Sequence, residues 1–440
     1  MSRKIKLLIL LKNKALPLPF IFKKKLFQNA FAYTVCNALK QALPFCLIPV
    51  LTRYLSPEGY GVLAIIQTAI SFLVIVLGFN SQGLLLVKFV TIENKNLTNY
   101  VSGIFFIITF TSFIALCLAC SQKKIIETFL NAHFFWAILI VVATFFESIS
   151  SILLVLWQAQ QVPLRFGLFQ IGQSFINVLL SLFLVILIGW GWEGRILGIT
   201  LSSIVFGIVS VLILNKNNLH FLRFKWPNVK EALLFGAPSV PHSLGAWLNG
   251  SIGLFLVNSM IGVGASGLYS VGFQVGMVVS FLATSFNQAW VPFLFEKLAK
   301  NNFSDKIKIV KLTYCYFFSM FFLVGSVSAA SAWLFPIFLS QEYYDAQKYV
   351  FFVSSAFAFQ GMYYMVTNYI FFMQKTYLLT FITVPVALIN VICSIIFINQ
   401  NGTIGAAQGL AASSFFSFIL TWIISNKIYK MPWLLKNNLK

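Results

Sequence analysis

The sequence carries little charge for its length, and acidic residues are especially scarce. Only 9% of its 440 residues are charged, Asp and Glu together number 10, and there are 3 His. An average soluble domain has about 25% charged residues, so a soluble chain is excluded. The few acids and histidines form no paired carboxylates, no metal-ligand cluster and no nucleophile-base set. We therefore predict no catalytic residues, no metal and no cofactor, and hence no enzyme.

Cysteine is also sparse, and its placement argues against a disulfide framework. The 6 Cys fall in or at the ends of apolar segments. Cys117 and Cys120 form a C-x-x-C pair, but no second pair or His accompanies it. This pattern is more typical of packing residues than of a redox or zinc site.

Long apolar runs are what the sequence has in abundance. Hydrophobic residues make up 59% of the chain, with 49 Phe, and runs of about 20 residues recur along its length between short polar breaks. We predict an all-α polytopic membrane protein of about twelve transmembrane helices. The expected spans are 27–52, 60–83, 97–120, 132–157, 164–188, 194–214, 231–258, 264–293, 310–335, 348–373, 376–398 and 403–426.

The basic residues predict the orientation of these spans. Of the 31 Lys and Arg residues, 25 fall on the side of both termini, and Lys40 alone lies well inside a span. The opposite loops hold the other five, which are Arg53, Lys123, Lys124, Arg195 and Lys348. By the positive-inside rule both termini are cytoplasmic. The net charge of +21 then indicates contact with anionic membrane lipids rather than with nucleic acid.

The chain matches itself at three collinear offsets. At 207, Gln67, Phe79 and Asn80 match Gln274, Phe286 and Asn287. At 213, Phe146, Asn177 and Ser181 match Phe359, Asn390 and Ser394, with Glu147 replaced by Gln360; at 211, Gly194, Gly198, Ser202 and Ser203 match Gly405, Gly409, Ser413 and Ser414. Each half has an even number of spans, so the halves are parallel, and a transport path is expected between them.

This repeat divides the chain into five parts. We expect a retained basic tail at 1–26, an N-terminal six-helix lobe at 27–214 and a basic cytoplasmic linker at 215–230. A C-terminal six-helix lobe at 231–426 and a basic cytoplasmic tail at 427–440 follow.

Polar residues inside the spans follow helical stripes. In the first span Asn37, Lys40, Gln41 and Pro44 are spaced i, i+3, i+4 and i+7, on one face. A mid-membrane Lys costs about 2.5–3.5 kcal/mol on insertion scales, so this face should turn inward. Other spans carry stripes of amides, hydroxyls, one acid and one His. Any single amide could instead form an interhelical hydrogen bond worth about 0.6 kcal/mol. Glu147 could be a partner for Lys40 or a neutral carboxyl, and His242 could be a purely structural residue.

The stretch "LPFCLIPVLTRYLSPEGYGVLAIIQ" at 43–67 resembles the Wzx-type polysaccharide flippases of the multidrug/oligosaccharidyl-lipid/polysaccharide exporter superfamily. Their pattern at the first turn is met by Pro49, Thr52, Arg53, Leu55, Ser56, Pro57, Glu58, Tyr60 and Gly61. The resemblance implies a V-shaped pair of six-helix lobes that work by alternating access. The cargo would be an undecaprenyl-pyrophosphate-linked oligosaccharide, an O-antigen or capsule repeat unit, flipped across the bacterial inner membrane. A polysaccharide polymerase and a chain-length regulator would be candidate partners, alongside membrane lipids.

Together these observations predict a site. Lys40, with Arg53 toward the outer mouth and Arg165 at the inner mouth, would attract the anionic cargo. Glu147 would be the ion-coupling group. Amides and a His, which offer hydrogen bonds without a fixed charge pattern, would line the rest of the path: Asn37, Gln41, Gln67, Asn177, His242, Gln274, Asn287 and Gln360.

Three alternatives remain open. A cation-coupled multidrug antiporter of the same superfamily would rely on intramembrane carboxylates, and only Glu147 is available in the expected spans. A lipid II flippase would tend to have extra spans and more cleft arginines. A membrane glycan polymerase or ligase, from another class, would need a large outer loop, and the outer loops here are short.

Overall fold

The computed structural model describes residues 35–36, 39–40, 42–91, 94–219, 224–373, 375 and 377–434, and these residues form helices and short turns without a strand. Ten helical segments are long and apolar enough to cross a membrane. The first expected span, 27–52, is described only in part, and its described end is a shorter apolar helix, Ala42–Tyr54. The seventh expected span, 231–258, is not among the ten. The prediction of an all-α polytopic membrane protein is confirmed.

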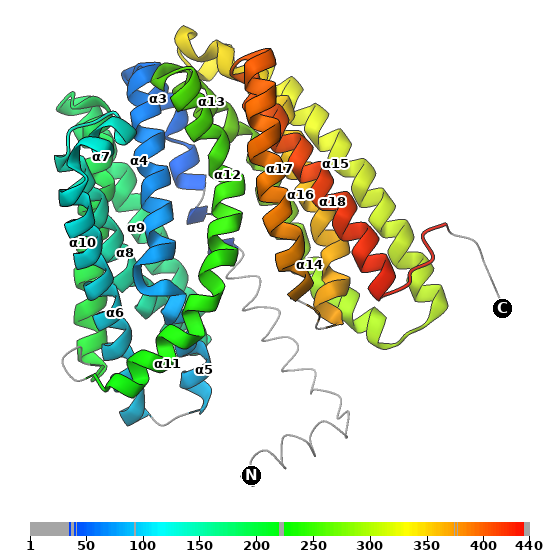
Figure 1. The fold of residues 1–440 in the computed structure, drawn as a ribbon, viewed down its shortest axis with the longest axis horizontal. Coiled ribbons are helices and arrows are strands. Elements are labelled where there is room, and N and C mark those ends of the chain that lie inside the picture. Colours follow the sequence, from blue (N-terminus) through cyan, green and yellow to red (C-terminus); the bar gives the residue numbers. More distant parts are fainter. Residues whose placement is uncertain are drawn as a thin grey trace.

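The helices form two lobes that lean together at one end, in a V (Figure 1). The first lobe contains α3 (Ile48–Tyr54), α4 (Pro57–Val76), η1 (Leu77–Gly83), α5 (Leu84–Thr91), α6 (Asn94–Ser121), α7 (Lys123–Leu130), α8 (Phe135–Ala159), α9 (Pro163–Leu182), η2 (Phe183–Leu187) and α10 (Gly191–Lys216). The second contains α12 (Val240–Met260), α13 (Val263–Gly276), α14 (Val278–Ala299), α15 (Phe303–Phe338), η4 (Gln341–Ala346), α16 (Gln347–Phe372), α17 (Tyr377–Asn401) and α18 (Ile404–Ile428).

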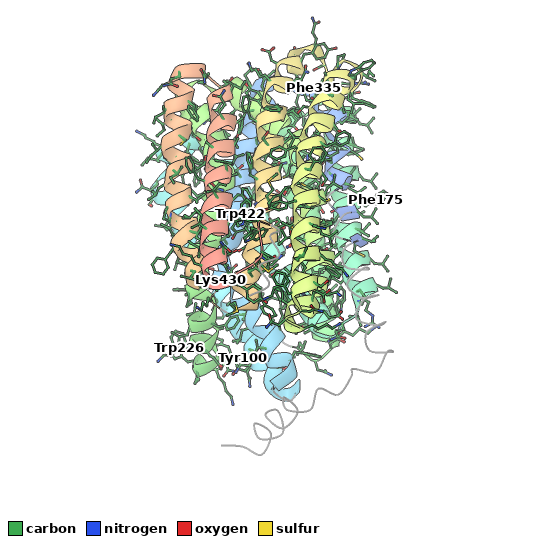
Figure 2. All side chains as sticks on the ribbon, turned by 90° about the vertical axis from the view of Figure 1, so that its right-hand side faces the viewer. Tyr100, Phe175, Trp226, Phe335, Trp422 and Lys430 are labelled. Carbon is green, nitrogen blue, oxygen red and sulfur yellow. The ribbon has the colours of Figure 1, made fainter. Side chains whose placement is uncertain are left out.

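We call the end that bears α7 and η4 the upper end, and the opposite end the lower end, as they stand in Figure 1. Figure 2 shows Phe335 at the upper end and Trp226 and Tyr100 at the lower end.

The second span is broken near its lower end. It begins in regular fashion, with Pro57 in the first turn of α4 and Ser56 as N-cap, whose hydroxyl accepts a hydrogen bond from Gly59 N at 3.2 Å. Twenty residues later Gly78, Phe79 and Asn80 have φ values of 81°, 51° and 53°. Three left-handed residues in succession cannot continue a right-handed helix. The chain therefore turns through η1 before resuming as α5.

Helix α11 (Trp226–Gly236) lies on the first lobe although it begins the second half of the chain. Its Glu231 carboxylate pairs with Lys88 Nζ of α5 at 2.5 Å and accepts a hydrogen bond from Tyr100 Oη of α6 at 2.5 Å. At its end, a methyl group on Gly236 would overlap the carbonyl oxygen of Phe79 in η1. The chain then passes through η3 (Ala237–Ser239) into α12, which packs on α17. Thus α11 begins inside the stretch expected to be the linker and is fixed to the first lobe.

The two lobes repeat one close helix crossing. In the first, Gly198 of α10 lies against Ser181 of α9; in the second, Gly409 of α18 lies against Ser394 of α17. In both places an added methyl group would meet the serine backbone and hydroxyl. Small residues at such crossings let helices approach closely in membranes. These are residues that the sequence repeat aligned.

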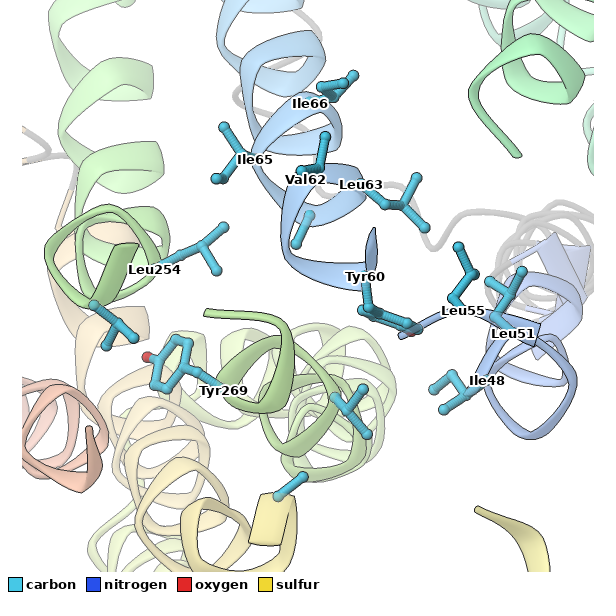
Figure 3. Close-up of a cluster of buried hydrophobic side chains, with 14 of the residues drawn as sticks. Ile48, Leu51, Leu55, Tyr60, Val62, Leu63, Ile65, Ile66, Leu254 and Tyr269 are labelled. Carbon is cyan, nitrogen blue, oxygen red and sulfur yellow. The ribbon is translucent and has the colours of Figure 1, made fainter. Parts of the chain in front are cut away.

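Each lobe has its own buried core, and a third core joins them. The shared core contains Tyr60 of α4, Leu254 of α12, Tyr269 of α13 and Tyr343 of η4. Figure 3 shows side chains of α3 and α4 gathered opposite Leu254 and Tyr269. The lobes are therefore packed against each other by buried apolar side chains, and within a bilayer such contacts are stabilised by close van der Waals packing.

Candidate functional site

The lobes are bonded to each other at the upper end. Ser340 Oγ donates a hydrogen bond to the carbonyl oxygen of Thr52 at 2.6 Å, and Tyr343 Oη donates to that of Leu55 at 2.9 Å. Both acceptors lie at the end of α3, where the last carbonyls of a helix have no partner within the helix. The second lobe thus supplies the donors that this helix end requires.

The closest approach of the lobes is a crossing of glycines. A methyl group on Gly61 of α4 would overlap the carbonyl oxygen of Val263, and one on Gly267 of α13 would overlap that of Pro57. Beside this crossing, Gln274 Nε2 of α13 donates a hydrogen bond to Tyr60 Oη of α4 at 3.2 Å. Backbone meets backbone here, so no side chain can move aside to admit a larger residue.

A row of polar contacts, which we call the seam, joins η1, α4 and the end of α7 to η3 and α12. Near the lower end, Asn80 Nδ2 donates to Ser239 Oγ at 3.2 Å and to Ser243 Oγ at 3.1 Å. Midway, Trp247 Nε1 donates to Ser71 Oγ at 2.9 Å. At the upper end Asn131 Nδ2 donates to Asn258 Oδ1 at 3.4 Å. This side of the lobe interface is therefore held from one end to the other.

Lys40 lies near Glu147, as one of the two interpretations of Glu147 predicts. Both side chains are partly exposed, and they interact electrostatically, although no ion pair within 4.0 Å joins them among the described residues. The carbonyl oxygen of Lys40 accepts a hydrogen bond from Ser174 Oγ of α9 at 3.4 Å, which joins the backbone at Lys40 to the first lobe. The predicted stripe cannot be followed further, because Asn37 and Gln41 lie outside the described residues.

Arg195 was expected in an upper loop, and this prediction is wrong. It lies one turn inside α10 and is only 5% exposed. Its Nη1 donates hydrogen bonds to Asn177 Oδ1 and, at 2.6 Å, to Ser181 Oγ, while its Nε has no hydrogen-bond partner in the part of the chain that the structure describes. The expected span began at residue 194, one residue before Arg195, so the sequence placed this cation at the boundary of the span. Helix α10 begins three residues earlier, at Gly191, which puts Arg195 one turn inside it. Lys40 is therefore not the only cation inside the first lobe.

The other predicted cations lie at the two ends. Arg53 is exposed at the end of α3, at the upper end, and Arg165 is exposed in the first turn of α9, at the lower end. Gln67 of α4 and Gln360 of α16 are partly buried. His242 lies in the first turn of α12, but its side chain is outside the described part of the chain.

Several predicted amides bond to other side chains. Asn177 accepts from Arg195, Gln274 bonds Tyr60 and Ser270, and Asn287 Oδ1 accepts from Asn368 Nδ2 at 2.8 Å. Such hydrogen bonds are expected of polar residues that hold a bundle of membrane helices together.

A similar amide cluster in the second lobe was not predicted as part of the site. Asn390 Nδ2 donates to Asn249 Oδ1 at 2.8 Å, and Ser394 Oγ donates to Asn390 Oδ1 at 3.1 Å. The sequence repeat pairs Asn390 with Asn177, and that alignment could have revealed the cluster.

The arrangement can bind an anion and many hydroxyl groups, and it offers no visible covalent chemistry. No group of three or more His, Cys, Asp or Glu that could hold a metal occurs in the described ranges. The polar groups are mostly amides and hydroxyls, which can exchange hydrogen bonds with a hydroxyl-rich ligand.

Comparison with solved structures shows the same fold in transporters. A multidrug resistance MATE family transporter of the MOP superfamily, in its inward-facing conformation, aligns with a TM-score of 0.74 and 12% identity, over 88% of this chain and 94% of that chain. The lipid II flippase MurJ, in an inward closed conformation, aligns with a TM-score of 0.71 and 16% identity, over 90% and 87%. The expected V-shaped, two-lobed transporter fold is confirmed.

Sequence comparison adds the family. A Haemophilus influenzae protein of the Lsg locus is 26% identical over 373 residues, which is 81% of this chain and 87% of that protein. The family model described as polysaccharide biosynthesis protein matches residues 26–298, more than half of the chain. This chain is a multi-pass membrane protein that belongs to the polysaccharide biosynthesis protein family, with the two-lobed fold of flippases and transporters.

Proposed function

We propose that this protein is a flippase, not an enzyme, that moves an undecaprenyl-pyrophosphate-linked oligosaccharide across the bacterial inner membrane. The cargo would be an O-antigen or capsule repeat unit. The observation that carries the proposal is Lys40, a cation inside a membrane-spanning lobe that interacts electrostatically with Glu147 of α8. Family membership supports a saccharide as the cargo.

The chemistry of Lys40 fits a pyrophosphate. A cation in the bilayer core is costly unless an anion or water meets it. Glu147 offsets that cost when no cargo is bound. An incoming pyrophosphate, with several charged acceptor oxygens, competes for the same ammonium group through charge-assisted hydrogen bonds. Binding of cargo would therefore weaken the electrostatic interaction between Glu147 and Lys40.

The charges and the lobe contacts support a direction of entry. The lower end carries most of the described basic residues, among them Lys88, Lys216, Lys225, Lys230 and the lysines from Lys297 to Lys311. The positive-inside rule makes that end, and both termini, cytoplasmic. Because the lobes are bonded together at the upper end, cargo would enter this conformation from the cytoplasm. The two solved structures above are also described as inward conformations.

Glu147 would couple the movement to an ion gradient. It is an acidic side chain in the middle of α8, so protonation or sodium binding there would change the charge that faces Lys40. Alternating access needs such a step, because only a ligand with different affinities for two states can shift them. A polysaccharide polymerase and a chain-length regulator would receive the cargo on the far side.

The proposal is tested by glycan export in a deletion strain complemented with this gene. Lys40→Ala, at normal membrane protein level, should abolish export, and Lys40→Arg should restore most of it. Lys348→Ala, an exposed cation at the upper end of the second lobe, is the matched control and should export normally. Full export by Lys40→Ala would remove Lys40 from cargo binding. The lipid-linked intermediate that accumulates in the deletion strain identifies the cargo.

A cation-coupled multidrug antiporter is the second candidate, because a multidrug transporter shares the fold. It would bind small cations rather than a pyrophosphate, so Lys40 would repel its substrate. Expression in a drug-hypersensitive host separates the two. Resistance that depends on Glu147, together with unchanged glycan export on deletion, would reverse our ranking. A glycan polymerase or ligase would be indicated by new glycosidic bonds formed by the purified protein.

A further inference from the structure

A large apolar groove runs along the first lobe, apart from Lys40 and Glu147. It has a volume of about 880 Å³ and lies between α4 and α6, with α8 beneath it. Its walls include Ala69 and Phe72 of α4 and Phe110 and Ala115 of α6, and Ile140 of α8 forms part of its floor. Among the described residues, no member of the predicted site lines it.

The groove offers almost no hydrogen-bonding group at mid-depth. The one hydroxyl with which α6 lines the groove belongs to Thr111. It donates a hydrogen bond to the carbonyl oxygen of Ile107 at 2.8 Å and accepts one from Gly78 N at 3.3 Å. The hydroxyl is thus used within the protein. An occupant therefore needs an apolar body without internal polar groups, as a hydrocarbon chain has.

The groove is longer than one leaflet. Its lining on α6 runs from Phe106 to Ala119, which at about 1.5 Å per residue is about 20 Å. A bilayer core of about 30 Å gives each leaflet about 15 Å. A phospholipid acyl chain would therefore end before the groove does, whereas a polyisoprenoid chain would fill it.

Both mouths are bordered by amphipathic helices that carry cations and aromatic rings. At the lower mouth α11 contributes Trp226, next to the exposed Lys225 and near the exposed Lys230 (Figures 1 and 2). At the upper mouth α7 contributes Phe129, on the helix that begins with the exposed Lys123 and Lys124. Aromatic and basic residues at these depths are typical of lipid headgroup contacts. A phosphate could thus be held at either end of the same groove.

The groove borders the seam between the lobes. Phe72 lines it and also packs on Trp247 of α12, with ring centroids 5.0 Å apart. Phe129 lines it and packs on Phe255 of α12 at 5.1 Å. These rings form the partition between groove and seam. If the lobes part along α4 and α12, a chain in the groove stays in place while its headgroup enters between them.

We propose that this groove binds the polyisoprenoid chain of the lipid-linked saccharide. The inference rests on the proposed function and deepens it. A chain that already extends past the middle of the bilayer does not have to turn over. Only the pyrophosphate and sugars move from the lower to the upper end.

The test uses an undecaprenyl pyrophosphate analogue with a photoreactive diazirine near the end of its chain, added to the purified protein in lipid nanodiscs. Light should attach it to peptides within 69–76 and 106–119, and unlabelled undecaprenyl pyrophosphate should compete. Ala115→Trp fills the groove and should lower labelling to the level of the competed sample, because the indole ring occupies the space that the chain needs. Cys117→Trp is the matched control and should label as the wild type does. Cys117 lies on the same helix two residues further on, and it is exposed on a face, shared with Phe113, that does not line the groove.

A phosphatidylglycerol carrying the same diazirine on its acyl chain is the second arm. If it labels the groove as strongly, and undecaprenyl pyrophosphate does not compete, the groove holds bilayer lipid and the proposal is overturned. Labelling confined to other segments overturns it too.

A flipping assay of the lipid-linked saccharide in proteoliposomes separates this proposal from the proposed function. Flipping by the wild type that Ala115→Trp leaves unchanged counts against the groove alone. Competed groove labelling without any flipping supports the groove and counts against the proposed function alone.

Discussion

Replacing Gly267 by alanine should open the upper end of the lobe interface. The added methyl group would overlap the carbonyl oxygen of Pro57 and lie 2.9 Å from Gly61 N and 3.0 Å from the carbonyl carbon of Pro57. All three are backbone atoms, so the overlap is relieved only if α13 and α4 separate. Overpacking of this kind costs about 1–3 kcal/mol. Helix propensity does not offset it, because alanine favours α13 equally in both conformations.

Only the conformation described here bears this cost, so the substitution shifts the population of molecules toward conformations with an open upper end. An energy of about 1–3 kcal/mol corresponds to roughly a 5- to 150-fold change in the ratio of closed to open upper ends. Spin labels at Tyr54 and Gln341, in a background without native cysteines, would report it. Both residues are exposed, and they lie beside the Thr52 to Ser340 hydrogen bond. Pulsed electron paramagnetic resonance should show the short distance in the wild type and its loss in Gly267→Ala.

Gly325→Ala is the matched control, since an added methyl group there meets nothing within 4 Å. It should leave the distance distribution as in the wild type. Gly61→Ala, on the facing helix, should act like Gly267→Ala, because its methyl group would overlap the carbonyl oxygen of Val263. An unchanged distance in both glycine variants, in well-folded protein, would refute the claim that this crossing closes the upper end.

Three further substitutions give separate tests. Arg195→Met should reduce export while leaving the melting temperature unchanged or raising it. Burying a cation without a carboxylate within 4.0 Å in the described ranges costs more free energy than its two hydrogen bonds contribute. A fall of several degrees in the melting temperature would make Arg195 a structural residue. Asn80→Ala removes two hydrogen bonds across the seam, worth about 1–3 kcal/mol together, and should speed proteolysis near η3, with Thr109→Ala as control. Glu147→Gln should make export independent of the ion gradient, and export that still follows the gradient would exclude coupling through Glu147.

The spans were predictable because the bilayer restricts what a chain can do. Backbone groups in hydrocarbon must form their hydrogen bonds within the segment, so an apolar run such as the one from Phe135 to Ala159 is expected to be a transmembrane helix. The repeat was predictable for a similar reason. Glycine and serine at matched positions permit close crossings, and the structure places Gly198 on Ser181 and Gly409 on Ser394.

What the sequence left undetermined depended on three-dimensional contacts. Local pattern cannot show that α11 is tied to the first lobe, because the bond from Glu231 joins it to Lys88 and Tyr100, which are more than 130 residues away. The break at η1 places the bulky Phe79 at positive φ, a conformation that such a residue rarely adopts. The burial of Arg195 depended on where a helix begins, which sequence patterns fix only to within a few residues. The stripe around Lys40 was visible from spacing, but its closeness to Glu147 was one of two open interpretations.

The two ends of α4 are held in different ways, and this difference bears on how the lobes could move. At its upper end Gly61 meets α13 through backbone contact. At its lower end η1 is joined to η3 by the hydrogen bonds of Asn80, directly after α11, which is itself fixed to the first lobe. Between α11 and α12, Pro238 of η3 has no backbone N–H to continue the helical hydrogen bonding, which favours bending there. The lobes could therefore part at the upper end while the lower joint persists. If so, Gly267→Ala should lengthen the upper distance and Asn80→Ala should not, and a change of the same kind in both would indicate general loss of packing instead.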